Sequence, residues 1–247
     1  MREQIYTIPV SEGFEAEGEC PFCAMYEKLE SDVLDFTLGP SYMEQDVRDM
    51  TNESGFCREH YKMLYDAQNR LGLALMVSTH MAAIENKMTK LLKDARGEKE
   101  KRRLFGKNDG GDPLAEFAET LDKSCFMCDK INASMDRYFD TFFYLWKNEK
   151  DFREKVLASK GFCVRHFERL VTMSREKMGS GARTEFLNAA EKLQTENFKR
   201  VHDELLWFIS KFDYRFKDKP WENSKDSLHR AIIKVASFDT EKGIENK

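Results

Sequence analysis

The chain has 247 residues, enough for one or two domains with a substantial core. Its 34% charged and 41% hydrophobic residues are typical of a soluble globular protein. The net charge of −4 gives no general electrostatic reason to bind nucleic acid or an anionic membrane, and the low content of proline (5) and glycine (13) favours helix over sheet.

The N-terminal sequence has no apolar core of the kind found in signal peptides. The longest apolar run, residues 71–77, is far too short to span a membrane. We therefore expect a cytoplasmic protein. In that compartment cysteines stay reduced and serve as ligands more often than as disulfide partners.

The first segment of the chain, residues 1–92, is expected to begin with a short extended piece over residues 4–10. A helix should then start at Cys20 and stop at Gly39-Pro40. A short helix capped by Ser41 and a turn over residues 51–55 follow. From Phe56 onward, an apolar stripe at helical spacing predicts one long helix to about Leu92, with a kink or close packing at Gly72.

The rest of the chain is predicted to contain a linker, a second helical segment and a tail. Residues 93–112 are charged and rich in glycine, which is typical of a solvated linker. Residues 113–216 repeat the pattern of the first segment, except that Gly179-Ser-Gly181 should split its last long helix. Residues 217–247 form a tail with one short helix from about Lys225 to Ala236, capped by Asn223 or Ser224.

Two short motifs occur twice in the chain. Cys-x-x-Cys lies at residues 20–23 and 125–128, and Gly-Phe-Cys-x-x-His lies at residues 55–60 and 161–166. Together they use all 6 cysteines and two of the 5 histidines. The sequence therefore predicts two pseudo-repeated helical hairpins, each closed by its own metal site. The expected ligands are Cys20, Cys23, Cys57 and His60 in the first half, and Cys125, Cys128, Cys163 and His166 in the second.

The chemistry of these residues favours zinc. Two thiolates of a Cys-x-x-Cys turn can chelate one ion, and a helix that starts there lowers the thiol pKa. In Cys-x-x-His on the first turn of a helix, both side chains face the same way. Three sulfurs and one imidazole form the tetrahedral set that zinc prefers in closed structural sites. We expect two zinc ions per chain.

Other interpretations of the cysteines remain open. An iron–sulfur cluster with one histidine ligand is chemically possible, although less favoured than zinc. A redox-active Cys-x-x-Cys of the thioredoxin kind needs a preceding strand, and the sequence before Cys125 does not predict one. Disulfides within one half would leave one thiol unpaired.

The remaining histidines and aromatic residues are assigned to packing or to the surface. His80 lies too far along its predicted helix to join His60 at one site, and neither His202 nor His229 has a cysteine nearby. The run from Trp207 to Trp221 mixes aromatic and basic residues, so it could bind a partner. Docking of this run onto the helices is favoured, because aromatic side chains contribute most when they are buried.

Further motifs extend over nearly the whole chain. They are Ile5-Tyr-Thr-Ile-Pro9, Leu38-Gly-Pro40, Asp46-Val-Arg48, Thr51-Asn-Glu-Ser-Gly-Phe-Cys57, Asn69-Arg-Leu-Gly-Leu73, Phe212-Asp-Tyr-Arg215 and Lys219-Pro-Trp-Glu-Asn-Ser-Lys225. With these and the cysteine motifs, the chain resembles an uncharacterised family of bacterial proteins, found mostly in anaerobic Gram-positive bacteria and described only as a domain of unknown function. The resemblance implies a similar fold and shared cysteine and histidine positions. It implies no activity.

We therefore predict an all-α protein whose metal ions are structural. The favoured function is that of an interaction or scaffold protein with an unknown protein partner, and neither nucleic acid nor a membrane is favoured as a partner. One alternative is a thiol or metal sensor that releases zinc on oxidation. The other is an enzyme with a cleft between the two halves, although the sequence nominates no catalytic residues.

Overall fold

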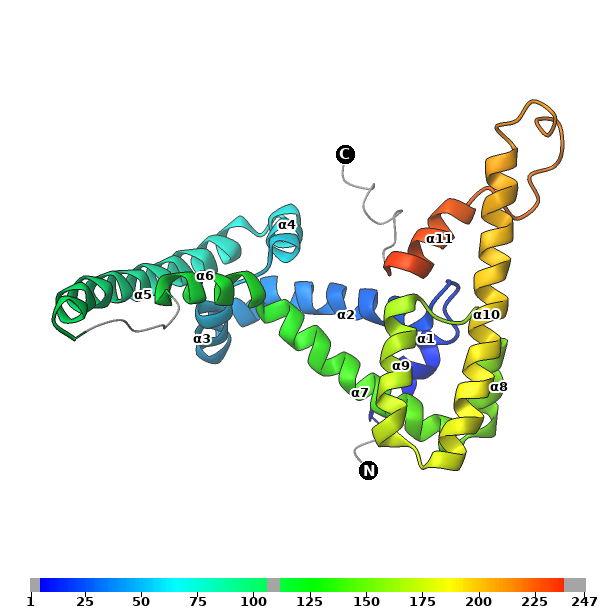
Figure 1. Ribbon diagram of the computed structural model, residues 1–247, viewed down its shortest axis with the longest axis horizontal. Helices are drawn as coiled ribbons and strands as arrows, with labels where there is room; N and C mark the ends of the chain where they lie inside the picture. The colour runs from blue at the N-terminus through cyan, green and yellow to red at the C-terminus, as the bar shows by residue number, and fades with distance from the viewer. Residues whose placement is uncertain (1–4, 106–111, 238–247) are drawn as a thin grey trace. The chain divides into compact units, whose positions relative to one another are not determined.

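The structure, a computed structural model, describes residues 5–105 and 112–237 (Figure 1). Within these ranges every regular element is a helix, so the prediction of an all-α protein is confirmed. None of the described helices combines the length and the apolar character needed to cross a membrane. The chain forms two compact units, which we call unit 1 (residues 1–28 and 134–247) and unit 2 (residues 29–133).

Unit 1 combines helices from the two ends of the chain. They are α1 (Thr7–Gly13), the start of α2 (Pro21–Leu38), most of α7 (Phe126–Asn148), α8 (Lys150–Ala158), α9 (Val164–Lys177), α10 (Ser180–Ser210) and α11 (Ser227–Ala236). The long helix α10 packs against α8, α9 and α11, and α11 also contacts α9 (Figure 1).

The core of unit 1 is aromatic. The rings of Phe22 and Phe139 stack with their centroids 4.2 Å apart, and Phe142 lies among further rings from α1, α8 and α10. The buried aromatic residues of this core are Phe14, Phe22, Tyr138, Phe139, Phe142, Phe143, Trp146, Phe152, Phe162 and Phe186. Because each such side chain removes a large apolar area from water, unit 1 has a strong hydrophobic core of its own.

Unit 2 has a smaller core. Its helices are the end of α2, η2 (Pro40–Met43), α3 (Gln45–Ser54), α4 (Arg58–Asp66), α5 (Arg70–Phe105), α6 (Pro113–Lys123) and the start of α7. Helix α5 contacts α3, α4 and α6. The buried hydrophobic residues of unit 2, apart from the cysteines, are Val47, Phe56, Leu64, Leu73, Met76, Phe126, Met127 and Ile131.

Three local predictions for the first segment are wrong. Ser41 does not cap the short helix, since α3 begins at Gln45 after Glu44 and has no side-chain cap. The N-terminal piece expected to be extended forms helix α1 from Thr7, while Gln4 lies outside the described residues. The helix expected from Phe56 to Leu92 is broken over residues 67–69, where Gln68 has a left-handed backbone with φ of 67°. The side chain of Asn69 stabilises the new helix start, because its Oδ1 accepts a hydrogen bond from the Gly72 amide at 3.0 Å.

Gly72 is a site of close packing, one of the two possibilities expected there. A Cβ atom at this position would lie 2.9 Å from Asn69 Nδ2 and 3.1 Å from the Tyr42 ring. The break comes before Gly72, at Ala67–Asn69. Both halves of the chain therefore have a split helix after their Cys-x-x-His motif, since α9 and α10 are also separate helices.

The predicted linker and tail are also partly helical. Helix α5 runs on to Phe105, so residues 93–105 continue the helix instead of forming a loop, and the remaining linker residues 106–111 lie outside the described residues. The tail helix is present as α11, but it begins at Ser227 after Asp226 and has no side-chain cap. Ser224, one of the expected caps, instead donates its hydroxyl proton to the carbonyl of Trp221 at 2.6 Å.

Candidate metal centres

The eight predicted ligands come together in two clusters. Cluster 1 lies in unit 1 and consists of Cys20, Cys23, Cys163 and His166; cluster 2 lies in unit 2 and consists of Cys57, His60, Cys125 and Cys128. In each cluster the four ligand atoms all lie within 4.8 Å of one another. Each therefore offers the three sulfurs and one imidazole nitrogen that the sequence predicts.

The pairing of the motifs differs from the prediction. Each half was expected to close its own site, but each cluster combines the Cys-x-x-Cys motif of one half with the Cys-x-x-His motif of the other. A site of this kind joins segments that are far apart in the chain. In cluster 1, Cys23 and Cys163 are separated by 140 positions.

The distances within cluster 1 match a tetrahedral metal site. Cys23 Sγ lies 3.7 Å from Cys163 Sγ. His166 Nδ1 lies 3.4 Å from Cys20 Sγ, 3.5 Å from Cys23 Sγ and 3.1 Å from Cys163 Sγ. A zinc ion with ordinary bond lengths at the centre of a tetrahedron separates two sulfurs by about 3.8 Å and a sulfur from a nitrogen by about 3.6 Å.

Cluster 2 has nearly the same geometry. Cys57 Sγ lies 3.9 Å from Cys128 Sγ. His60 Nδ1 lies 3.2 Å from Cys57 Sγ, 3.2 Å from Cys125 Sγ and 3.4 Å from Cys128 Sγ. The sulfur–sulfur distances in both clusters are far from the length of about 2.05 Å of a disulfide bond, and all 6 cysteines are free.

Helix starts position the ligands. Cys163 precedes α9, and its sulfur accepts a hydrogen bond from the His166 amide at 3.5 Å. Cys57 likewise directly precedes α4, although its sulfur accepts no capping hydrogen bond there. The two Cys-x-x-Cys motifs lie at the first residues of α2 and α7. Because the N-terminal end of a helix carries partial positive charge, these positions stabilise thiolates.

A glycine in a conformation that other residues rarely adopt precedes each Phe-Cys pair. Gly55 has φ of 59° and ψ of −149°, and Gly161 has φ of 76°. The side chain of Gln194 holds the second turn, since it accepts a hydrogen bond from the Phe162 amide at 3.0 Å and donates one to the Phe162 carbonyl at 2.8 Å. At the first turn, the ring of His80 occupies the space where a Cβ of Gly55 would lie.

Replacing these glycines should affect the two turns differently. A Cβ at Gly55 would lie 2.4 Å from His80 Nε2, whereas a Cβ at Gly161 would lie 3.3 Å from Gln194 Oε1. We expect Gly55→Ala to lower the free energy of unfolding by about 2–4 kcal/mol and Gly161→Ala by about 1 kcal/mol. Urea unfolding at equal zinc concentration measures both values. Gly181→Ala is the control, since a Cβ there meets nothing within 4 Å. Equal losses for Gly55→Ala and Gly161→Ala would contradict the prediction.

The pKa values indicate that the thiols of each cluster cannot all ionise without a cation. In cluster 1, burial raises the pKa of Cys20 to about 12, and the hydrogen bond with Cys163 raises that of Cys23. The pKa of Cys163 is lowered, because the thiols of Cys20 and Cys23 donate to its sulfur. Metal binding must displace the remaining thiol protons, so it is expected to weaken as the pH falls.

In cluster 2, burial alone would raise the pKa of Cys125, but the hydrogen bond with His60 and backbone amides lower it to about 6. Burial raises the pKa of Cys128. For His60, the hydrogen bonds with Cys125 and Glu30 outweigh the effect of burial and raise the pKa to about 10. The contact between His60 Nδ1 and Cys125 Sγ favours the charged form of each group, and a metal ion bound there would take the place of the ring proton on Nδ1.

The two clusters differ in burial. All four residues of cluster 1 are buried, whereas Cys57 and Cys128 of cluster 2 are partly exposed. In cluster 2, the second ring nitrogen of His60 lies 3.3 Å from Glu30 Oε1. A carboxylate at this position orients a histidine ligand and increases its basicity. Cluster 1 is therefore shielded from solvent, and cluster 2 is less completely shielded.

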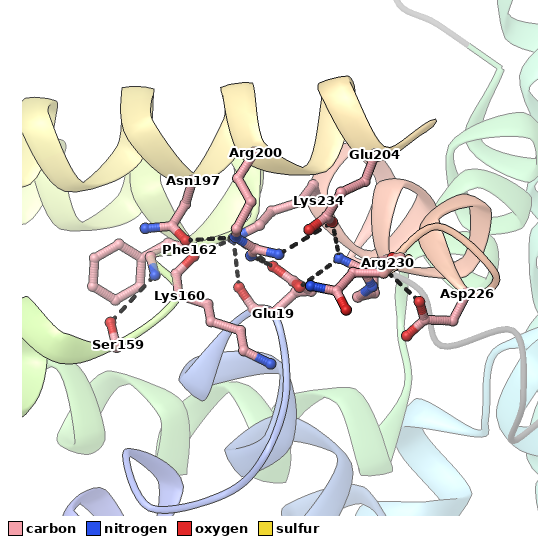
Figure 2. A network of polar contacts seen from close by, with 12 residues as sticks. Glu19, Ser159, Lys160, Phe162, Asn197, Arg200, Glu204, Asp226, Arg230 and Lys234 are labelled. Carbon is pink, nitrogen blue, oxygen red and sulfur yellow. Dashed lines mark hydrogen bonds and ion pairs between the residues drawn. The ribbon is translucent and has the colours of Figure 1, made fainter. Parts of the chain in front are cut away.

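A buried network of charged residues adjoins cluster 1 (Figure 2). Sequence analysis missed it. Glu19, the residue before Cys20, is 2% exposed, and Lys234 of α11 is 1% exposed. Arg200 Nη2 lies 2.6 Å from Glu19 Oε2, and Lys234 Nζ lies 3.3 Å from the same atom. Arg230 and Glu204 extend the network along α11 and α10. A sequence signal exists, because Arg230 and Lys234 share the helical spacing of the buried Ser227.

The other residues considered from sequence have varied outcomes. His80 is buried, as expected for a packing residue, and its Nδ1 lies 2.8 Å from the Asn52 carbonyl oxygen. His202 is exposed. The aromatic run from Trp207 to Trp221 does not dock onto the helices as a whole. Trp207, Phe208, Phe216 and Trp221 contact rings within the run, while Phe212 and Tyr214 are 78% and 85% exposed.

Among the comparisons with known proteins, only the comparison with sequence families gives a match. No curated protein and no solved structure gives a significant match. A family of unknown function (DUF6062) matches residues 1–242, nearly the entire chain. The chain therefore belongs to this family of unknown function.

Proposed function

We propose that clusters 1 and 2 are structural zinc sites and that the protein is a zinc-stabilised interaction protein. The observation that carries the first part is the geometry of the ligand atoms, since sulfur–sulfur separations of 3.7 and 3.9 Å fit one ion at the centre of each cluster. An iron–sulfur cluster distributes its ligands over two or more irons and therefore needs wider spacing.

The ligand sets favour a structural role for the metal. Each cluster supplies four protein ligands, so a tetrahedral ion has no open position for water or substrate. Each ion would fix two helix starts from distant parts of the chain. Cross-links that close long loops reduce the entropy of the unfolded chain. Zinc thus stabilises both units by joining segments that are far apart in the sequence.

The loop after α10 is the surface that best fits a protein partner. Lys211 is buried inside it, and its ammonium group donates hydrogen bonds to the carbonyls of Phe216 at 2.6 Å and Lys217 at 3.1 Å. The loop is thereby held in one conformation while it exposes Phe212 and Tyr214. Exposed aromatic side chains on a pre-organised loop are typical of binding hot spots, because little conformational entropy is lost on binding.

Elemental analysis of the purified protein tests the metal assignment. The proposal predicts two zinc ions per chain. A single ion, or iron with visible absorbance, would contradict it.

Affinity capture tests the interaction surface. The proposal predicts that proteins retained specifically by the wild type are lost with the double variant Phe212→Ala/Tyr214→Ala, while its zinc content and helicity stay unchanged. Leu157→Ala is the matched control, because Leu157 is an exposed hydrophobic residue (49% exposed) outside this loop. Identical retained proteins for the wild type and the double variant would contradict the assignment of this surface.

A thiol or metal sensor is the second candidate, and the partial exposure of Cys57 and Cys128 favours it for cluster 2 alone. Thiolates that solvent can reach are oxidised first, and oxidation of a ligand releases the metal. Mild peroxide is then expected to release one zinc ion per chain, reversibly on reduction, while cluster 1 keeps its ion. Retention of both ions under peroxide would remove this candidate.

A further inference from the structure

The residues next to the ligands are held together differently in the two clusters. In unit 2, Ser124 and Ser54 directly precede Cys125 and Gly55 in the sequence, and the Ser124 hydroxyl donates a hydrogen bond to the Ser54 carbonyl at 2.8 Å. The amide of Phe126 adds a second bond to the Gly55 carbonyl at 3.0 Å. Two short bonds therefore join the two ligand-bearing segments of cluster 2 directly.

In unit 1, the residues that correspond to the two donors cannot form these hydrogen bonds. The position of Ser124 is occupied by Glu19, whose carboxylate accepts hydrogen bonds and does not donate them when ionised. The position of Phe126 is occupied by Pro21, which has no amide proton. The segment before Cys20 therefore cannot bond to the segment before Cys163 in the way that unit 2 shows.

Lys234 of α11 supplies the missing connection. Its ammonium group donates to the carbonyl of Glu19 at 2.7 Å and to the carbonyl of Lys160, the residue before Gly161 (Figure 2). These are the residues that correspond to Ser124 and Ser54. Helix α11 also reaches the cluster itself, since the hydroxyl of Ser237 at its end donates to Cys163 Sγ at 3.0 Å.

We infer that Lys234 is a positioning residue for the metal of cluster 1, so that this site depends on the C-terminal helix and cluster 2 does not. The inference rests on the proposed zinc function. One ammonium group with three donors bridges two backbone carbonyls, and the Glu19 carboxylate offsets its buried charge. Without this bridge, the two ligand-bearing segments of cluster 1 can separate, and the metal is held less tightly.

Zinc release from the full-length protein tests the role of Lys234. The zinc-loaded chain is mixed with excess chelator, and release is followed with a chromophoric zinc indicator. Cys23→Ser and Cys128→Ser, each of which removes one site, assign the two release phases. Lys234→Met is expected to accelerate release from cluster 1 by at least about tenfold, the usual effect of removing a group that orients metal ligands, and to leave release from cluster 2 unchanged.

Arg230→Met is the matched control. Arg230 is a long cation on the same helix and pairs with the same Glu19, but it donates to neither Lys160 nor the Glu19 carbonyl. Its replacement should leave both release rates unchanged. If Arg230→Met accelerates release from cluster 1 as much as Lys234→Met does, the network acts as a whole and the inference is wrong.

Further outcomes separate this inference from the proposed function. Unchanged release from cluster 1 in Lys234→Met would overturn the inference alone, and so would equal acceleration at both clusters, which would show a general loss of stability. If Lys234→Met does not fold, Lys234→Gln is the milder variant, and the same criteria apply to it. A wild-type chain with fewer than two zinc ions would overturn the proposed function, and the inference would fall with it.

Discussion

Removal of zinc by a strong chelator is expected to lower the melting temperature of the protein by about 10–20 °C, which corresponds to a loss of about 5 kcal/mol in a chain of this size. The reason is that each cluster fixes two helix starts from distant parts of the chain. Unit 2 should unfold first, because its core is smaller and its cluster is partly exposed.

Circular dichroism during chelation measures this loss, and zinc added back in excess should restore the original melting curve. Magnesium, which prefers oxygen ligands, is the control ion and should restore nothing. An unchanged melting temperature after complete removal of the metal would contradict a structural role.

Cys163→Ser is expected to lower the free energy of unfolding by about 4–5 kcal/mol, and Cys57→Ser by about 2–3 kcal/mol. The side chain of Cys163 is fully buried, and its loss leaves Cys20, Cys23 and His166 without a metal in the interior of unit 1. Cys57 is partly exposed, so water can solvate the groups that remain in cluster 2.

Urea unfolding of both variants at equal zinc concentration, with their zinc content measured in parallel, gives this comparison. Each variant should lose one ion. Equal losses of stability, or a greater loss for Cys57→Ser, would contradict the prediction. The continuous helix that the sequence predicts after Cys57 would also make the loss of stability smaller for Cys57→Ser than for Cys163→Ser. That reason does not hold, because α4 and α5 are separate helices.

Repetition made the candidate ligands predictable. The duplicated motifs single out six cysteines and two histidines as candidate ligands, and helical periodicity gives most of the helices. The positions where this periodicity fails are local. Gln68 carries no signal for a left-handed backbone, and the break it introduces depends on the Asn69 side chain and on the packing of Gly72 against Tyr42.

The sequence favours the wrong pairing of the motifs. A site closed within one half forms a shorter loop than a site between the halves, and its closure costs less conformational entropy. Helix lengths decide against it. Helix α2 has 18 residues and α3 has 10, which correspond to about 27 and about 15 Å. For α7 and α8 the numbers are 23 and 9 residues. In each half the second helix is therefore too short to bring the Cys-x-x-His motif back along the whole first helix to its own Cys-x-x-Cys motif.

The charged network beside cluster 1 was missed for a different reason. A lysine in a short tail helix is normally predicted to lie at the surface, since lysine is almost never fully buried without a partner. The partners of Lys234 are Glu19 and two backbone carbonyls, more than 70 positions away in each case. No periodicity within α11 identifies them.

The zinc content of two double variants tests the cross-pairing of the motifs most directly. Cys20→Ser/Cys163→Ser removes two ligands of cluster 1, so the protein should keep one zinc ion per chain in cluster 2. Cys20→Ser/Cys57→Ser removes one ligand from each cluster, so the protein should keep none. If each half closed its own site, the results would be reversed: the first variant would hold no zinc and the second would hold one ion.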